Sequence, residues 1–117
     1  GCNGKKARQL ITDPIVEREI RRQIGKPQGT LTKTDLGKVK ELILSGTKLT
    51  DAGLEDVAKV KNLSRLSLQV NDITDTGLKE VAKLTQLERV QLYATKVTAE
   101  GVAELQKELP ECKIDWP

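Results

Sequence analysis

The sequence predicts an α/β solenoid of short strands and helices, because three stretches of the chain superimpose at a fixed step of 24 residues. These stretches are residues 42–54, 66–78 and 90–102, and each carries apolar residues at the same positions. Self-similarity at a period of roughly 20 to 50 residues is typical of solenoids, whose units bury their apolar faces only by stacking on neighbours. Such a chain is expected to offer a binding surface and to carry no chemistry.

The composition predicts one domain with an aliphatic core. The chain has 117 residues, which suits a single modest core. It contains no Phe, Met or His, one Trp and one Tyr, so Leu, Ile, Val and Ala must supply the buried volume. No apolar run approaches the ~18 residues that a membrane-spanning helix needs.

The charge distribution argues against a nucleic-acid binder. The net charge is +3, with seven basic and three acidic residues in 1–30 against 13 basic and 14 acidic residues in 31–117. A nucleic-acid-binding domain concentrates Lys and Arg on one face and interleaves aromatic residues. The repeats do neither, so we expect no nucleic-acid partner.

The N-terminal part of the chain predicts a tether followed by a capping helix. Residues 1–12 begin polar and are expected to form a flexible tether, with a single domain over 13–117. Asp13 suits the N-cap position, Pro14 suits the first helical residue, and Gly25 suits the helix end. A helix placed before the first repeat would cover an otherwise open apolar end. The predicted parts are a helical N-cap (13–30), three repeats (31–110) and a terminal strand (111–117).

Each repeat has the same local signals. The pattern Leu63-x-x-Leu66-x-Leu68 and its equivalents predict short strands with one buried face. A small hydrogen-bonding residue follows each strand and is expected to satisfy backbone groups at the bend: Thr47, Asn71 and Thr95. Thr50, Thr74 and Thr98 suit helix N-caps, and Gly53, Gly77 and Gly101 are interpreted as allowing a tight start to each helix.

The period extends to the last residues. Ile114 and Trp116 lie 24 residues after Val90 and Leu92, which predicts a fourth strand without its own helix. Trp116 is expected to cover the open end of the core. Cys112 in this segment is interpreted as a small buried side chain.

The repeat pattern carries a family resemblance. The full Leu-x-x-Leu-x-Leu-x-x-Asn-x-Ile motif at 63–73, continued by Thr-Asp-Thr-Gly-Leu, resembles the leucine-rich-repeat superfamily. Residues 14–53 are similar to the helical N-cap and first repeat of bacterial cell-surface proteins of the internalin kind, and residues 109–114 look like a bacterial leucine-rich-repeat terminus. The resemblance implies a right-handed solenoid, capped at both ends, with a parallel sheet on its concave side and helices on its convex side. It implies protein recognition as a general role.

The residues favour neither catalysis nor a bound cofactor. Without His, acid–base work would fall to carboxylates or Lys, and a Ser or Cys nucleophile would lack its usual base. The acidic residues near Asn71 and Asp75 lack the ligand density of a calcium loop and are better explained by helix capping. We therefore predict no catalytic residues, no metal site and no cofactor.

The solvent-facing strand positions form the candidate binding site. In the Leu-x-Leu frame these positions are 41, 43 and 45 and their equivalents in the next two repeats. Tyr and Arg are the residue types that most often anchor protein interfaces. The predicted protein-binding residues on the concave face are Arg65, Gln69, Arg89, Gln91 and Tyr93.

The residues at the start of the chain suggest a lipid anchor. The chain has no Met, so we expect a processed or truncated product, and Gly1-Cys2 before a polar segment looks like the cleavage point of a bacterial lipoprotein. Cys2 would then carry the lipid, and Lys5, Lys6 and Arg8 would add attraction to anionic head groups. The alternative is that the chain merely begins there.

The sequence thus predicts a protein-binding or scaffold module with a protein partner of unknown identity. The expected location is the bacterial cell envelope, with membrane attachment only through Cys2, or the cytoplasm if Gly1-Cys2 is only a chain boundary. Two other roles stay open, an inhibitor or regulator of an enzyme and a purely structural module in a larger assembly. The oligomeric state is also open.

Overall fold

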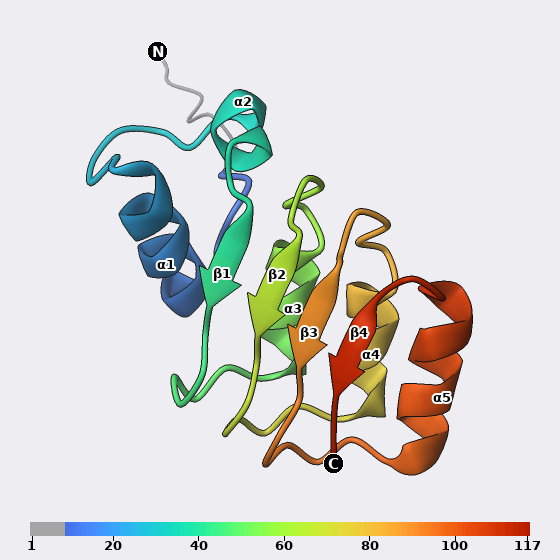
Figure 1. Cartoon of the computed structure of the whole chain (residues 1–117). Helices are drawn as coiled ribbons and strands as arrows, with labels where there is room; N and C mark the ends of the chain where they lie inside the picture. Colours follow the sequence, from blue (N-terminus) through green and yellow to red (C-terminus); the bar gives the residue numbers. More distant parts are fainter. Residues whose placement is uncertain (1–8) are drawn as a thin grey trace.

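The chain forms a four-stranded parallel sheet with helices packed against one side (Figure 1), as described for residues 9–117 by a computed structural model. The elements in order are α1 (Pro14–Ile24), α2 (Lys33–Gly37), β1 (Glu41–Ile43), α3 (Asp51–Val57), β2 (Arg65–Ser67), α4 (Asp75–Val81), β3 (Arg89–Gln91), α5 (Ala99–Glu108) and β4 (Lys113–Asp115). The sheet order β1-β2-β3-β4 follows the sequence, so each of α3, α4 and α5 connects neighbouring strands. The predicted solenoid is confirmed.

The 24-residue step in the sequence matches the register of the sheet, because paired strand residues are 24 apart. Leu42 pairs with Leu66, Leu66 with Val90, and Val90 with Ile114. These side chains point inward, and the other side of the sheet forms the concave face. The fourth strand predicted near the end of the chain is therefore present and in register.

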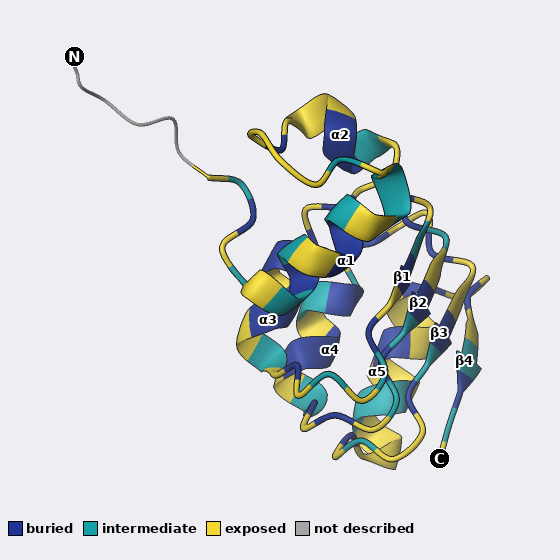
Figure 2. Cartoon of the chain, turned by 90° about the vertical axis from the view of Figure 1, so that its left-hand side faces the viewer, coloured by how far each residue is buried: buried dark blue, intermediate teal, exposed yellow. Residues whose placement is uncertain are grey.

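The core lies between the sheet and the helices (Figure 2). Leu44, Leu68 and Leu92, each directly after a strand, are fully buried, as are Leu54 and Val57 of α3. Stacked repeats thus bury one continuous aliphatic core, because a single repeat could not enclose its own apolar face.

Polar side chains satisfy the backbone where the chain leaves each strand. Asn71 is buried, and its Oδ1 accepts from the N–H groups of Thr47 (3.2 Å) and Leu49 (3.0 Å). Its Nδ2 donates to the carbonyl oxygens of Leu44 (2.8 Å) and Leu68 (3.0 Å). The hydroxyls of Thr47 and Thr95 donate to the carbonyls three residues before them, as predicted.

An aspartate at the start of one helix holds the start of the next helix. Asp51 accepts from the N–H of Thr74 at 2.9 Å, and Asp75 accepts from the N–H of Thr98 at 2.8 Å. The hydroxyls of both threonines also donate to these carboxylates. These contacts join successive repeats on the helix side of the core.

The same aspartates explain the repeated glycines, and they correct the interpretation from the sequence. A Cβ on Gly77 would overlap Oδ1 of Asp51, and a Cβ on Gly101 would overlap Oδ1 of Asp75. Gly53 has no positive φ, and neither do these two, so a tight helix start does not require glycine. Gly77 and Gly101 are needed because the aspartate of the preceding helix occupies the space of a side chain, whereas a Cβ on Gly53 would meet the side chains of Leu49 and Asp13.

Helix α1 covers the free edge of β1. Asp13 caps α1 by accepting from the N–H groups of Ile15 and Val16, and Gly25 ends it with φ 65°, as predicted. The Glu19 carboxylate accepts from the N–H of Ile43 at 2.9 Å, so a side chain takes the place of a further strand. Burial alone would raise the pKa of Glu19, but hydrogen bonds from Arg22, Gln23 and the Ile43 N–H outweigh it and lower the pKa.

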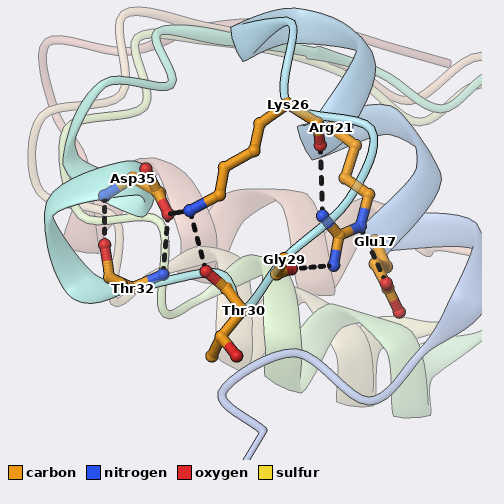
Figure 3. Close-up of polar contacts among 7 residues, drawn as sticks. All are labelled: Glu17, Arg21, Lys26, Gly29, Thr30, Thr32 and Asp35. Carbon is orange, nitrogen blue, oxygen red and sulfur yellow. Dashed lines mark hydrogen bonds and ion pairs between the residues drawn. The ribbon is translucent and has the colours of Figure 1, made fainter.

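The connection from α1 to α2 is held by two basic side chains (Figure 3). Arg21 binds Glu17 on its own helix and donates to the carbonyl of Gly29 at 2.8 Å. Lys26 binds Asp35 at 2.7 Å and donates to the carbonyl of Thr30. Together with the capping box of Thr32 and Asp35, the Lys26 ammonium lowers the pKa of Asp35 to about 2.

The residues just before α1 are also attached to the domain. Ile11 is buried, and the N–H groups of Thr12 and Asp13 donate to Oδ2 of Asp56 at 2.8 and 2.7 Å. The packed part of the chain therefore begins before the boundary expected at residue 13.

At the other end of the sheet, β4 completes the core. Cys112 is buried, as predicted, and burial raises the pKa of its thiol to about 11. Trp116 is partly buried and packs against the hydrophobic core. In the described residues no helix is long and apolar enough to cross a membrane.

Candidate protein-binding face

The strand register places the predicted site residues on one surface, the concave face. Its first row is Glu41, Arg65, Arg89 and Lys113, and its second row is Ile43, Ser67, Gln91 and Asp115. The parallel ladder continues beyond the strands through Gly46 N–H to Gln69 O (3.0 Å) and Val70 N–H to Tyr93 O (3.0 Å). Gln69 and Tyr93 therefore follow in a third row, and all five predicted residues come together.

The C-terminal half of this face is held by polar contacts. Arg89 Nε lies 2.6 Å from Oδ2 of Asp115, and this hydrogen bond raises the pKa of Arg89. The Ser67 hydroxyl donates to Oε1 of Gln91 at 2.9 Å. Asp115 was missed as a site residue, although its position 24 residues after Gln91 was available as a signal.

Arg65 differs from Arg89 in its environment. The two arginines are in direct register, yet no ion pair to Arg65 occurs among residues 9–117. A hollow of about 120 Å³ lies between them and is also lined by Glu41, Ser67 and Gln91. Like charges directly opposite each other on a sheet repel, and the Glu41 carboxylate at the edge of this hollow forms no ion pair with Arg65, so the Arg65 guanidinium is open to a further carboxylate.

Large apolar side chains are exposed at only a few places in the described structure, and those places are on or next to this face. Ile43 is 44% exposed, Val70 60% and Tyr93 45%. Val70 also has φ 62°, a left-handed conformation that β-branched residues disfavour. Sequence reasoning did not select Ile43 or Val70, because neither belongs to a residue type enriched at interfaces.

One polar atom on this face is unsatisfied. The Oε1 of Gln69 is buried and accepts no hydrogen bond from any described residue. Buried polar atoms without partners are uncommon, and they deserve a physical explanation. Gln69 lies beside Tyr93 in the third row and directly before Val70 in the sequence. The unsatisfied atom therefore belongs to a residue that adjoins two of the exposed apolar residues.

The described part of the chain shows no group of three or more residues arranged to hold a metal ion. Cys112 is a poor nucleophile because its raised pKa keeps the thiol protonated near neutral pH. The predicted lipid attachment point, Cys2, lies outside the described residues, as do Lys5, Lys6 and Arg8.

Comparisons with known proteins agree with this geometry. Residues 38–58 and 61–82 match the family model described as "Leucine Rich repeat". A search of curated proteins gave no match. The chain therefore has a leucine-rich-repeat fold with a parallel sheet and helices packed on it.

Two solved structures illustrate the likeness. Internalin C2 from Listeria monocytogenes str. 4b F2365 aligns over 90% of this chain and 54% of its own, with 22% identity and a TM-score of 0.62. Actin-binding site 2 of leiomodin-1 aligns over 88% of this chain and 77% of its own, with 16% identity and a TM-score of 0.59. At these identities the likeness shows the fold alone.

Proposed function

We propose that this chain is a non-enzymatic protein-binding module that binds its partner through the concave face. The observation that carries the proposal is the position of the exposed apolar side chains: Ile43 ends β1, and Tyr93 and Val70 follow two and three residues after the ends of β3 and β2. Elsewhere in the described structure the large apolar residues are buried or partly buried. Solvated aromatic and aliphatic groups gathered on one face favour a protein interface.

The charges indicate the chemistry of the partner. Arg89 is already paired with Asp115, whereas Arg65 forms no ion pair within residues 9–117, although Glu41 lies opposite it in register. A partner carboxylate placed there would receive charge-assisted hydrogen bonds from Arg65. The proposed partner surface therefore combines an apolar patch for Tyr93 and Val70 with an acidic side chain for Arg65.

Affinity capture tests this proposal. Wild-type protein is used to capture partners from native envelope extracts, beside a Tyr93→Ala, Arg65→Gln double variant. The control is a Glu55→Ala, Lys61→Ala variant, which changes exposed residues away from the concave face. We expect the double variant to lose the bound protein and the control to keep it. If the double variant retains the partner as well as wild type does, the concave face is not the binding site.

The same capture distinguishes the two other roles. An inhibitor or regulator of an enzyme would bind one acidic partner, and binding through Arg65 would weaken as salt rises. A purely structural module would keep its contacts in the double variant and lose them when other surfaces are changed.

We further propose that the protein is a lipoprotein of a bacterial envelope, anchored through Cys2. Gly1-Cys2 and the basic residues that follow support this location. In bacterial cells that express the full precursor, we expect the native protein in the membrane fraction and a Cys2→Ser variant in the soluble fraction. A precursor with no apolar segment ahead of Gly1-Cys2 would refute the lipid anchor without affecting the concave site.

A further inference from the structure

Helices α4 and α5 lie next to each other on the helix side of the sheet (Figure 1), and a groove runs between them, away from the concave face. Its volume is about 550 Å³, and its apolar floor is the partly buried Ala82 above the buried side chains of Leu78 and Leu105. The aliphatic stems of the long charged side chains on either side extend this apolar lining. The groove is therefore a separate feature that the concave-face proposal does not use.

The two flanks of the groove carry opposite charges. Glu100, Glu104 and Glu108 lie along α5 at steps of four residues and line one flank. Residues four apart lie on the same side of a helix, about 6 Å from one another along its axis. The other flank is lined by Lys79 of α4 and by Lys83, two residues beyond the end of α4, with Asp75 at the start of the helix.

These charges are not used to hold α4 and α5 together. Lys83 pairs with Glu80 of α4 at 3.0 Å, and Glu104 pairs with Lys107 on the same helix, α5, at 3.6 Å. In residues 9–117 no ion pair crosses the groove from one flank to the other. Exposed pairs within one helix are weak, so both rows remain available to a ligand.

The walls of the groove limit the kind of ligand that fits. Both walls are helices, whose backbone groups are already hydrogen-bonded within each helix. They therefore leave no row of free N–H and C=O groups to which an extended peptide could add as a β-strand. A helix satisfies its own backbone and packs readily into the groove between two parallel helices. We propose that this groove binds an amphipathic helix of another protein, with an apolar seam, basic residues on one flank and acidic residues on the other.

The charge order gives the bound helix a direction. Its basic flank lies against the glutamates of α5, and its acidic flank lies against Lys79 and Lys83. Turning the helix end for end would exchange its flanks and place like charges together. A peptide with its two flanks exchanged therefore binds in the opposite direction.

A designed peptide tests this inference. The probe is an 18-residue helical peptide with a leucine seam, Lys on one flank and Glu on the other, labelled with fluorescein and followed by anisotropy. Replacing Glu100, Glu104 and Glu108 by Lys is expected to weaken binding about tenfold. Also replacing Lys79 and Lys83 by Glu restores the affinity, with the peptide reversed. A spin label on one peptide end then broadens amide signals at the opposite end of α5.

Matched controls keep the result independent of the proposed function. The Tyr93→Ala, Arg65→Gln variant is expected to bind the peptide as wild type does, and a peptide whose leucines are replaced by Gln is expected not to bind. Circular dichroism melting checks that each variant is folded. The inference is overturned if the peptide does not bind, if the charge-reversed variant binds it equally well, or if amide shifts map to β1, β2 and β3.

Discussion

At the scale of single residues, the backbone conformation after each strand shows a conflict between stability and exposure. The equivalent positions in the three repeats are Gly46, Val70 and Ala94, with φ of 64°, 62° and 54°. Glycine adopts this left-handed conformation without cost, and a β-branched residue is strained by it. Val70 is also 60% exposed, so its side chain gains little from burial. A strained and exposed valine is better explained by contact with a partner than by folding.

We predict that Val70→Gly stabilises the protein by about 1 kcal/mol, because the gain from relieving the left-handed valine exceeds the added freedom of glycine in the unfolded chain. Urea denaturation measures this change. The converse variant, Gly46→Val, is expected to destabilise by a similar amount. An unchanged midpoint in both variants would show that this backbone conformation carries no strain.

Asn71 gives the opposite case, a residue on which stability depends. Its side chain satisfies backbone groups on two neighbouring repeats. We predict that Asn71→Ala lowers the free energy of unfolding by about 3 kcal/mol, because several buried groups lose their partners. Asn71→Thr is expected to cost less, since Thr47 and Thr95 bond the carbonyl three residues earlier in the equivalent positions. Thermal and urea unfolding compare the two variants.

At the scale of elements, the contact between an aspartate and the glycine of the next helix determines how repeats stack. The three atoms nearest to a Cβ built on Gly101 all belong to Asp75. The side chain of Asp75 therefore excludes any larger residue there, while its oxygens accept from Thr98.

This arrangement predicts that the effect of Gly101→Ala on stability changes sign when the Asp75 side chain is removed. Gly101→Ala is expected to destabilise the wild-type protein by about 1 to 3 kcal/mol, because the added methyl group overlaps the carboxylate. In an Asp75→Ala background the same change is expected to stabilise by about 0.5 kcal/mol, because alanine favours helix over glycine. A double-mutant cycle by urea denaturation measures both effects. Equal effects of Gly101→Ala in the two backgrounds would contradict this account.

At the scale of elements, some features of the strands and helices could be predicted from the sequence and others could not. Strand register, strand positions and the capped start of α1 were predictable, because the period places Leu42, Leu66 and Val90 in one frame and Asp13 before Pro14. The role of Gly77 was not, because it depends on where Asp51 of another repeat lies. Helix amphipathicity predicts which face of α1 is buried but not that Glu19 turns toward the N–H of Ile43.

The same division applies to the candidate site. The alternation of strand residues correctly placed all five predicted side chains on one face. The pairing of Arg89 with Asp115 depends on side-chain geometry across two strands, so the sequence could not separate a compensated arginine from Arg65. Whether these residues bind a partner stays a prediction for the capture experiment.

At the scale of the whole molecule, carboxylates fasten the N-terminal segment to the repeats. Glu19 accepts from β1, and Asp56 accepts from the N–H groups of Thr12 and Asp13. Burial of Asp56 opposes ionisation, but these hydrogen bonds and the ion pair with Lys59 outweigh it and lower its pKa. The folded pKa of each group lies below its ordinary value, 4.5 for Glu19 and 3.8 for Asp56.

A pKa lowered by folding means that the stabilisation is present above the ordinary value and is lost as pH falls through the folded value. We therefore predict that stability is constant near neutral pH and declines below about pH 4.5. Amide hydrogen exchange at Thr12, Asp13 and Ile43 should accelerate first. A Glu19→Gln variant should show a weaker pH dependence at Ile43. Uniform exchange across all strands in acid would contradict a weakness at the N-terminal end.

The aspartate contacts between helices also determine how the protein could be lengthened. A second copy of residues 61–84 placed after residue 84 would bring a threonine and glycine to meet Asp75, and an aspartate to meet Thr98 and Gly101. The first turn of α5 instead has Ala99 at the position of Asp51 and Asp75, so a helix stacked beyond α5 would find no such acceptor. The array therefore accepts modular insertion from within and resists extension past α5, which makes the middle repeat the natural unit for engineering a longer binding surface.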